Sequence, residues 1–228
     1  MRFCRCEMLI GADALENLKN SSVAVFGVGG VVEALTRSGV GRIAIIDKDV
    51  VDESNINRQI VALTSTIGKN KVDVMKQRIL DINPDVKVEA HCEFYLPDNA
   101  DFIELGSFDY VVDAIDNVTA KIELIKRCKQ EDVPIISAMG AGNKLDPTRI
   151  EIADISKTSV CPLAKVIRRK LADLGIEGVT VAYTREIPAN ASGGRTPASM
   201  MPVPAAMGLT MASKVLRDLS GMRIKSRS

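Results

Sequence analysis

At 228 residues, the chain is long enough for one large domain with a sizeable buried core. Apolar residues make up 46% and charged residues 26% of the sequence, and the formal net charge is only +1, so no strong overall field points to a nucleic-acid or membrane partner. The single histidine, His91, argues against multi-histidine metal sites, and the five cysteines form no CxxC pair, which argues against a structural zinc or a disulfide framework.

Apolar runs rich in valine and isoleucine alternate with helical patterns, which predicts βα units and a mainly parallel sheet. The expected fold is α/β, a Rossmann-like doubly wound sheet with a C-terminal extension of strands and a helix. In chain order, the expected strands are Ser22–Gly27, Arg42–Asp47, Val86–Cys92, Tyr110–Ile115, Pro134–Ala138, Arg149–Ile155 and Gly178–Tyr183. The expected helices are Ala12–Lys19, Lys69–Ile82, Asn117–Gln130, Leu163–Leu174 and Ala205–Leu219. The stretch Ile187–Pro204, rich in Pro, Gly, Ala and Ser, predicts a mobile loop.

The first predicted strand ends in the glycine turn GVGG, and the second ends at Asp47. Gly27, Gly29 and Gly30 stand where a backbone can turn tightly and approach phosphates closely. Asp47 stands where a carboxylate can accept hydrogen bonds from ribose hydroxyls. Taken alone, the glycine turn could serve only packing, and Asp47 could be an ordinary surface carboxylate. The glycine turn and Asp47 together indicate a nucleotide site.

A polar, cationic cluster, SNINRQ, follows this strand, and a lysine, Lys71, opens the next helix. A triphosphate needs such groups where pyrophosphate departs, because Arg offers a planar fork and Lys a point charge. Asp116 follows the fourth predicted strand, where it can hold Mg²⁺ that bridges phosphates. Alternatively, Lys71 is a solvated surface charge, and Asp116 caps the next helix.

The elements RFCR, GVGG, IIDKD, SNINRQ, GKNK and DAIDN stand in the same order as in the ubiquitin-activating-like superfamily of adenylating enzymes, which the chain resembles. The resemblance implies ATP contacts from Gly27, Gly29, Gly30, Asp47, Asn55, Arg58, Gln59, Lys71, Asp116 and Asn117. It implies catalytic roles for Arg5, Arg58, Lys71 and Asp116, with Asp116 holding Mg²⁺. Arg5, from RFCR, would reach across a homodimer interface into the partner's ATP site.

The second half, from SAMGAGNK to VIRRKL, resembles the tRNA threonylcarbamoyladenosine dehydratases within that superfamily. This resemblance implies a single adenylating domain over 1–228, with a nucleotide-binding part at 1–155 and a substrate and crossover-loop part at 156–228. It implies a cytoplasmic enzyme that uses ATP and Mg²⁺ to adenylate the threonine carboxylate of the modified adenosine and then close a ring. A monovalent cation and a sulfur-transfer partner protein are further expectations.

Other functions are weighed against this one. An adenylyltransferase for a ubiquitin-like sulfur-carrier protein is the nearest rival, but that branch usually carries CxxC pairs, which this chain lacks. An NAD-binding protein would not need SNINRQ, and a non-catalytic interaction module is a further alternative. The cluster Arg168, Arg169 and Lys170 is either a solvated face or a contact for RNA phosphates, and Arg195 could meet the tRNA at the end of the predicted loop.

Two further features each have two explanations. Cys161 precedes Pro162 at a helix start, where a thiolate is favoured; it is either a thioester-forming residue or a reduced, partly buried cysteine. The glycine turn runs straight into VVEALTRSGVG and is about one helical turn shorter than the resemblance leads us to expect. If residues are absent there, the chain should break between Val31 and Val32, and the stretch Pro188–Gly194 raises the same suspicion.

Overall fold

The computed structural model describes residues 2–189 and 197–222. The strands are β1 Ser22–Phe26, β2 Arg42–Ile46, β3 Lys87–His91, β4 Tyr110–Asp113, β5 Ile135–Ala138, β6 Ile150–Asp154 and β7 Thr180–Thr184. They form one sheet in the order β3-β2-β1-β4-β5-β7-β6, in which every neighbouring pair is parallel except β6 and β7. The α/β, mainly parallel fold expected from the sequence is therefore confirmed.

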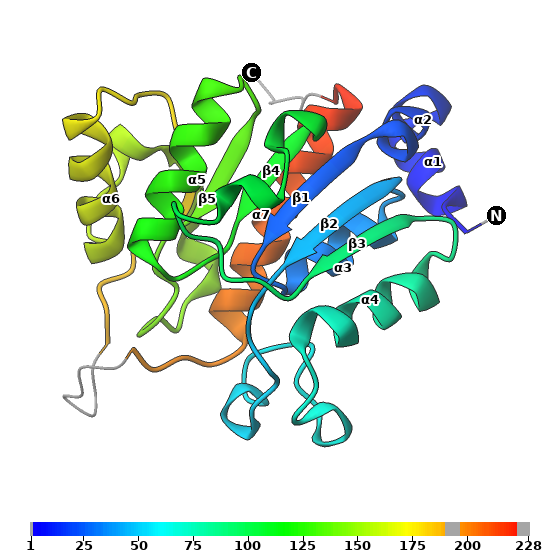
Figure 1. The fold of residues 1–228 in the computed structure, drawn as a ribbon, viewed down its shortest axis with the longest axis horizontal. Coiled ribbons are helices and arrows are strands. Elements are labelled where there is room, and N and C mark those ends of the chain that lie inside the picture. The colour runs from blue at the N-terminus through cyan, green and yellow to red at the C-terminus, as the bar shows by residue number, and fades with distance from the viewer. Residues whose placement is uncertain (1, 190–196, 223–228) are drawn as a thin grey trace.

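Helices cover both faces of this sheet (Figure 1). They are α1 Cys4–Ile10, α2 Ala12–Asn20, α3 Gly30–Arg37, α4 Lys71–Ile82, α5 Val118–Gln130, α6 Pro162–Asp173 and α7 Pro202–Ser220. One face packs against α5 and α6, and the other packs against α3, α4 and α7. The order in which the chain adds strands reverses between β1 and β4, which creates a crevice at the carboxyl ends of these two parallel strands.

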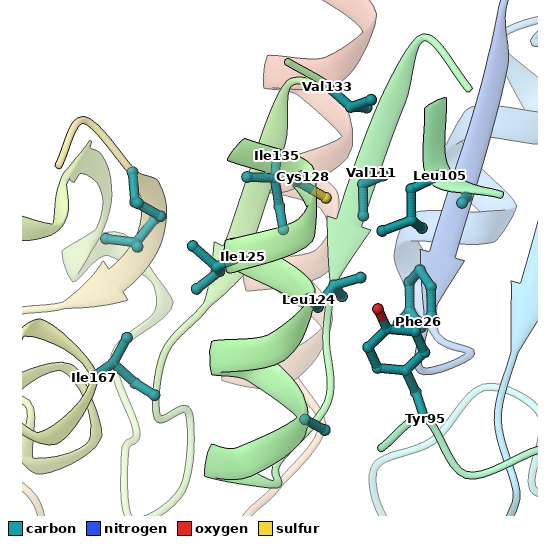
Figure 2. Close-up of a cluster of buried hydrophobic side chains, with 14 of the residues drawn as sticks. Phe26, Tyr95, Leu105, Val111, Leu124, Ile125, Cys128, Val133, Ile135 and Ile167 are labelled. Atoms are coloured by element: carbon teal, nitrogen blue, oxygen red, sulfur yellow. The ribbon is translucent and has the colours of Figure 1, made fainter. Parts of the chain in front are cut away.

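A hydrophobic core lies on each face of the sheet, and the residues of β1 belong alternately to one core and the other. The reason is that successive side chains of a strand point to opposite faces. Val23 and Val25 pack toward α3, α4 and α7, whereas Ala24 and Phe26 belong to the core beneath α5. Figure 2 shows Phe26 beside the ring of Tyr95 in that second core, and the ring centroids are 4.9 Å apart. The fully buried strand explains why the sequence reads as a continuous apolar run.

The C-terminal strand β7 lies between β5 and β6. It pairs in parallel with β5, through Ile136 opposite Thr180, and antiparallel with β6. The predicted extension after Ile155 therefore completes the same sheet instead of forming a separate layer.

The shortened helix after the glycine turn is continuous. Val31 and Val32 both lie inside α3, and the amide of Val32 donates to the carbonyl of Gly29 at 3.1 Å. The prediction of a break at Val31–Val32 is wrong, because α3 simply begins at Gly30 and ends at Arg37. The short glycine turn is thus part of the folded chain.

Two helices differ from the sequence-based prediction. Helix α1 was not predicted, since the RFCR segment holds no apolar periodicity, and none of its residues is buried. Helix α7 begins at Pro202, inside the predicted loop, because proline is tolerated in the first turn of a helix. Most of the suspected stretch Pro188–Gly194, and Arg195, lie outside the described residues.

Candidate active site

A cavity of about 510 Å³ opens at the carboxyl ends of β1, β2 and β4, where the strand order reverses. This is the place where ligands bind in open α/β sheets. Among its lining residues are the predicted site residues Gly27, Gly29, Gly30, Asp47, Arg58, Gln59, Lys71 and Asp116. Arg58, Lys71 and Asp116, which lie far apart in the sequence, therefore share one cavity.

The glycine turn is part of the cavity lining. Gly27 has a φ of +93°, and a Cβ added there would lie 2.8 Å from the carbonyl oxygen of Ala114. Only glycine fits, since both the backbone conformation and the close approach to the end of β4 exclude a side chain. A Cβ on Gly29 would meet open space, so the backbone of the turn is accessible from the cavity.

Asp47 at the end of β2 is tied to the glycine turn. Its carboxylate accepts hydrogen bonds from the amide of Val28 at 3.1 Å and from the amide of Asp49 at 2.9 Å. Burial raises the pKa of Asp47, although these amides and the charge of Lys71 act in the opposite direction. The carboxylate is thereby fixed at the cavity edge with acceptor capacity to spare.

Lys71 reaches the cavity from the first residue of α4. Its side chain is only 5% exposed, and its Nζ lies 2.7 Å from Oδ2 of Asp49. The amide of Lys71 also donates to the carbonyl of Asp49. The ammonium therefore has a fixed position, and the pairing rejects the alternative of a solvated surface charge.

Arg58 and Gln59 approach from the segment after β2. The Nη1 of Arg58 donates to the carbonyl of Ser54 at 2.7 Å and to Oδ1 of Asn57 at 3.0 Å. The Oε1 of Gln59 is buried and has no hydrogen-bond partner within the described residues. Because an unpaired buried polar atom is costly, this oxygen is a natural partner for a bound donor.

Asp116 lines the cavity just after β4, on a turn that a buried ion pair holds. Asp113 accepts from Nζ of Lys121 at 2.9 Å, from the hydroxyl of Ser137 at 2.5 Å and from the amide of Ile115 at 3.1 Å. Asp113 and Lys121 are completely buried. The sequence analysis identified Asp116 as a site residue but not Asp113. Asp113 is the first aspartate of the same motif, DAIDN, so the motif offered a signal for both.

Three predicted site residues do not line the cavity. Asn55 is buried in a capping arrangement with Asp52, whose amide donates to Oδ1 of Asn55. Asn117 is the N-cap of α5, and its Oδ1 accepts from the amide of Ala120 at 3.0 Å. Arg5 is exposed on α1, outside the cavity lining. Within this single chain, Asn55 and Asn117 stabilise turns next to lining residues, and Arg5 contributes nothing to the cavity lining.

An aromatic wall completes the cavity and was not predicted. Phe94 and Tyr95 follow β3 and line the opening, and Nζ of Lys48 lies 4.0 Å from the ring centroid of Phe94. Tyr95 packs edge-on against Phe26. In the sequence, this wall corresponds to the two adjacent aromatic residues of EFYL, shortly after the third strand. Such a pair could have predicted a surface for a flat, apolar part of a ligand.

The cavity continues past the glycine turn along α3. Glu33, Ala34 and Arg37 of α3 line this extension, together with the N-cap of α7, Met201, and with Pro204, Ala205 and Leu209 of α7. The segment before α7 is anchored here as well, since Nδ2 of Asn57 donates to the carbonyl of Ser199 at 2.8 Å.

Cys161 stands apart from this cavity. It is only 3% exposed and is the N-cap of α6, and its Sγ would lie 3.5 Å from a Cβ built on Gly140. It is not among the lining residues. The structure thus agrees with a reduced, buried cysteine.

Across residues 2–189 and 197–222, no three His, Cys, Asp or Glu side chains converge to form a metal cluster. A Mg²⁺ ion bound through one or two carboxylates and substrate phosphates needs no such cluster. The described helices include none that is both long enough and apolar enough to cross a bilayer.

Comparisons with known proteins point to one family. A family model described as the ThiF family matches residues 3–228. The tRNA threonylcarbamoyladenosine dehydratase of Bacillus subtilis (strain 168) is 49% identical over 240 residues, covering 96% of this chain and 94% of the relative. The crystal structure of the E. coli tRNA N6-threonylcarbamoyladenosine dehydratase in complex with ATP superposes with a TM-score of 0.90 and 34% identity, covering 96% of this chain and 94% of that one.

Similarity to the rival branch is more limited. The sulfur carrier protein adenylyltransferase of Thermus thermophilus is 39% identical over 112 residues, which cover 47% of this chain and 41% of the relative. The dehydratase similarity therefore covers nearly the whole chain, whereas the similarity to this adenylyltransferase covers 47% of it.

Proposed function

Since the chain belongs to the ThiF family, we propose that it dehydrates threonylcarbamoyladenosine in tRNA at the expense of ATP. The observation that carries this function is the 49% identity to a tRNA threonylcarbamoyladenosine dehydratase along nearly the full length of both chains. The cavity supplies the physical basis, because it gathers a glycine turn, cations and carboxylates at one set of strand ends.

ATP fits the groups that line the cavity. The accessible backbone at Gly29 and Gly30 suits phosphates, and the fixed carboxylate of Asp47 suits ribose hydroxyls. Phe94 and Tyr95 provide an apolar wall for the adenine ring. The buried Oε1 of Gln59 would gain a partner from a ligand donor.

Arg58 and Lys71 would neutralise the charge that develops on the departing pyrophosphate. Arg58 uses one guanidinium nitrogen for its contacts with Ser54 and Asn57, so other N–H donors are left for phosphate oxygens. Lys71 is held beside Asp49, which avoids reorganisation during the reaction. Asp116 would hold Mg²⁺, and the ion would supply Lewis-acid stabilisation of the phosphate oxygens.

The reaction proceeds in two displacements. An oxygen of the threonine carboxylate attacks the α-phosphorus of ATP, pyrophosphate leaves, and an acyl-adenylate forms. A nitrogen or oxygen of the same modified side chain then attacks the activated carbonyl, loses its proton, and expels AMP as the ring closes. The net change in the tRNA is the loss of water, and the cavity contributes position and preorganised charge.

No enzyme nucleophile is needed, because the second attacking group belongs to the substrate itself. The burial of Cys161 outside the cavity is consistent with this view. We infer that 1–228 acts as a single domain, because β7 from the substrate part lies between β5 and β6 of the same sheet.

We also propose that two copies form a homodimer in which Arg5 of each copy completes the partner's site. Exposed apolar residues on α1 support an interface there, since Met8 is 79% exposed and Leu9 is 80% exposed. A sulfur-transfer partner and a monovalent cation remain predictions from the sequence.

The test compares two carboxylate substrates. AMP and pyrophosphate release is measured with tRNA that carries threonylcarbamoyladenosine and with a sulfur-carrier protein that ends in Gly-Gly. Release with the modified tRNA is expected, together with conversion of the base to the cyclic form. Release with the carrier and none with the tRNA would assign the chain to the adenylyltransferase branch.

The same assay tests the proposed role of Arg58. Replacing Arg58 by Ala should lower turnover by about 10²-fold or more, because a preorganised cation at the leaving group is lost. The matched control is Arg149→Ala, which removes an exposed guanidinium paired with Asp146 outside the cavity. Full activity of the folded Arg58→Ala enzyme would remove Arg58 from the reaction.

A further inference from the structure

Helix α6 carries a group of basic side chains. Lys165, Arg169 and Lys170 are exposed, and Arg168 is half-buried. None of the four forms an ion pair with a carboxylate in the part of the chain that the structure describes. We call these four residues the α6 basic face.

Four other helices contain a basic side chain that pairs with a carboxylate on the same helix. Ion pairs of this kind are Lys19–Glu16 on α2, Arg37–Glu33 on α3, Arg127–Glu123 on α5 and Lys214–Asp218 on α7. The net charge of the protein is only +1, so the α6 basic face is a local concentration of charge and not a consequence of overall composition.

The packing of α6 turns these cations outward. Ala164, Ile167 and Leu171 are buried against the core, which leaves the opposite side of the helix in solvent. Lys165 and Arg169 are four residues apart and therefore neighbours on that side. Like charges at this spacing repel, so the arrangement costs stability unless an anion lies across it.

Arg168 is held at the flank of this face. Its Nη1 donates to the carbonyl of Thr158 at 2.9 Å and to the hydroxyl of Thr158 at 2.6 Å. Both acceptors are neutral, so the guanidinium keeps its full charge while its direction is restricted. Such a group contacts phosphate with less loss of side-chain freedom.

Helix α6 begins near the carboxyl edge of the sheet, the edge at which the cavity opens. Helix α6 begins at Pro162, next to Gly140, and a Cβ on Gly140 would lie 3.8 Å from Leu163. Gly140 follows β5, which is the neighbour of β4, the strand that leads to Asp116. In Figure 1, α6 lies beyond α5 on the side of the sheet opposite to α4.

We propose that the α6 basic face binds backbone phosphates of the tRNA while the modified base occupies the cavity. This inference rests on the proposed function, because a tRNA extends far beyond the one nucleoside that reacts. Contacts to phosphates position a nucleic acid without reading its sequence. They also release counterions, so the interaction weakens steeply as the salt concentration rises.

The experiment uses the full chain with Lys165→Gln, Arg169→Gln and Lys170→Gln combined. Arg168 is left in place because it contacts Thr158. The Kd for tRNA carrying threonylcarbamoyladenosine is measured between about 50 and 200 mM salt. The Kd should rise by about tenfold or more, and the slope of log K against log salt should become shallower by about 2 to 3. The Kd for ATP without tRNA should be unchanged, which reports an intact cavity.

The matched control removes three positive charges elsewhere, through Lys19→Gln, Lys76→Gln and Lys87→Gln on α2, α4 and β3. Its Kd and salt slope should equal those of the wild type. If the control weakens binding as much as the α6 variant, or if the α6 variant keeps the wild-type slope, the proposal is overturned. Failure of the proposed function looks different, because the wild type itself would then release no AMP with the modified tRNA.

Discussion

Two buried side chains, Asp113 and Lys121, hold the turn that brings Asp116 to the cavity. They are completely buried and 2.9 Å apart, and Asp113 also accepts from the amide of Ile115 within the turn. A buried ion pair need not add net stability, but loss of one partner leaves an uncompensated charge in the core. The pair therefore links the stability of the protein to the geometry of its site.

Replacing Lys121 by Met should lower the free energy of unfolding by about 3–5 kcal/mol, because Asp113 is left buried without a counter-charge. Adding Asp113→Asn should restore much of this loss, since Asn is neutral and still accepts from the amide of Ile115. Urea denaturation of the single and double variants measures both effects.

Lys126→Met serves as the control on the same helix. Lys126 pairs with Glu123, but its side chain is 37% exposed, so its loss should change the free energy of unfolding by about 0.5 kcal/mol or less. A double variant less stable than Lys121→Met would show that the charge of Asp113 is not what destabilises the single variant.

The sequence was sufficient to predict the position of site residues that directly follow a strand. Gly27 and Asp47 follow buried strands directly, so their position at the sheet edge could be predicted. The pairing of Lys71 with Asp49 and the aromatic wall at Tyr95 depend on how distant segments pack. Asn55 lies outside the cavity lining, because a polar residue in a motif caps a turn as readily as it binds a ligand.

For helices and strands too, the features set by local sequence could be predicted, and those set by the packing of distant segments could not. The buried strands were predicted to within about two residues, because continuous valine and isoleucine runs have few other uses in an α/β protein. The position of β7 between β5 and β6 could not be predicted, since local sequence does not encode strand order. Helix α1 has no buried side and therefore left no periodic signal.

Glu33 joins the shortened helix α3 to α4. Its carboxylate lies 2.6 Å from Nε of Arg78 and 2.7 Å from Nη2 of Arg37, and its side chain is 13% exposed. Burial acts to raise the pKa of Glu33, but the hydrogen bonds and charges of Arg78 and Arg37 outweigh it, so the pKa is lowered. A helix of eight residues gains little stability from its own hydrogen bonds, so this connection helps to hold it.

Replacing Glu33 by Gln should lower the free energy of unfolding at neutral pH by about 1–3 kcal/mol, because charge-assisted hydrogen bonds to two guanidinium groups are weakened. Because the pKa of Glu33 is lower in the folded state, its contribution is present above the unfolded-state pKa of roughly 4.3. The contribution is lost as the pH falls through the folded pKa, so the difference between the two proteins should shrink below about pH 4.

Unfolding free energies measured from pH 7 to pH 3 test this dependence. Glu16→Gln is the control, since Glu16 is 61% exposed and its pair with Lys19 should contribute almost nothing. A difference between wild type and Glu33→Gln that stays constant over the whole pH range would rule out the ion pairs as its cause.

The cavity lining combines distant parts of the chain, from Phe26 on β1 to Leu209 on α7, yet Arg5 lies outside it. Helix α1 buries none of its residues, and its exposed Met8 and Leu9 suggest contact with a second copy. In a two-fold dimer, each copy would donate Arg5 to the other and receive the same residue in return. This exchange makes a specific prediction for mixed dimers.

Arg5→Ala and Arg58→Ala should each be inactive alone, and mixing them under conditions that allow subunit exchange should restore about a quarter of the wild-type activity. The reason is that half of the dimers are mixed, and each mixed dimer contains one site with both arginines intact. AMP release with modified tRNA measures the recovery. Mixing Arg58→Ala with Lys71→Ala is the control, and it should restore nothing, because both residues line the cavity of their own chain. Equal recovery in both mixtures, or none with Arg5→Ala, would place Arg5 outside the partner's site.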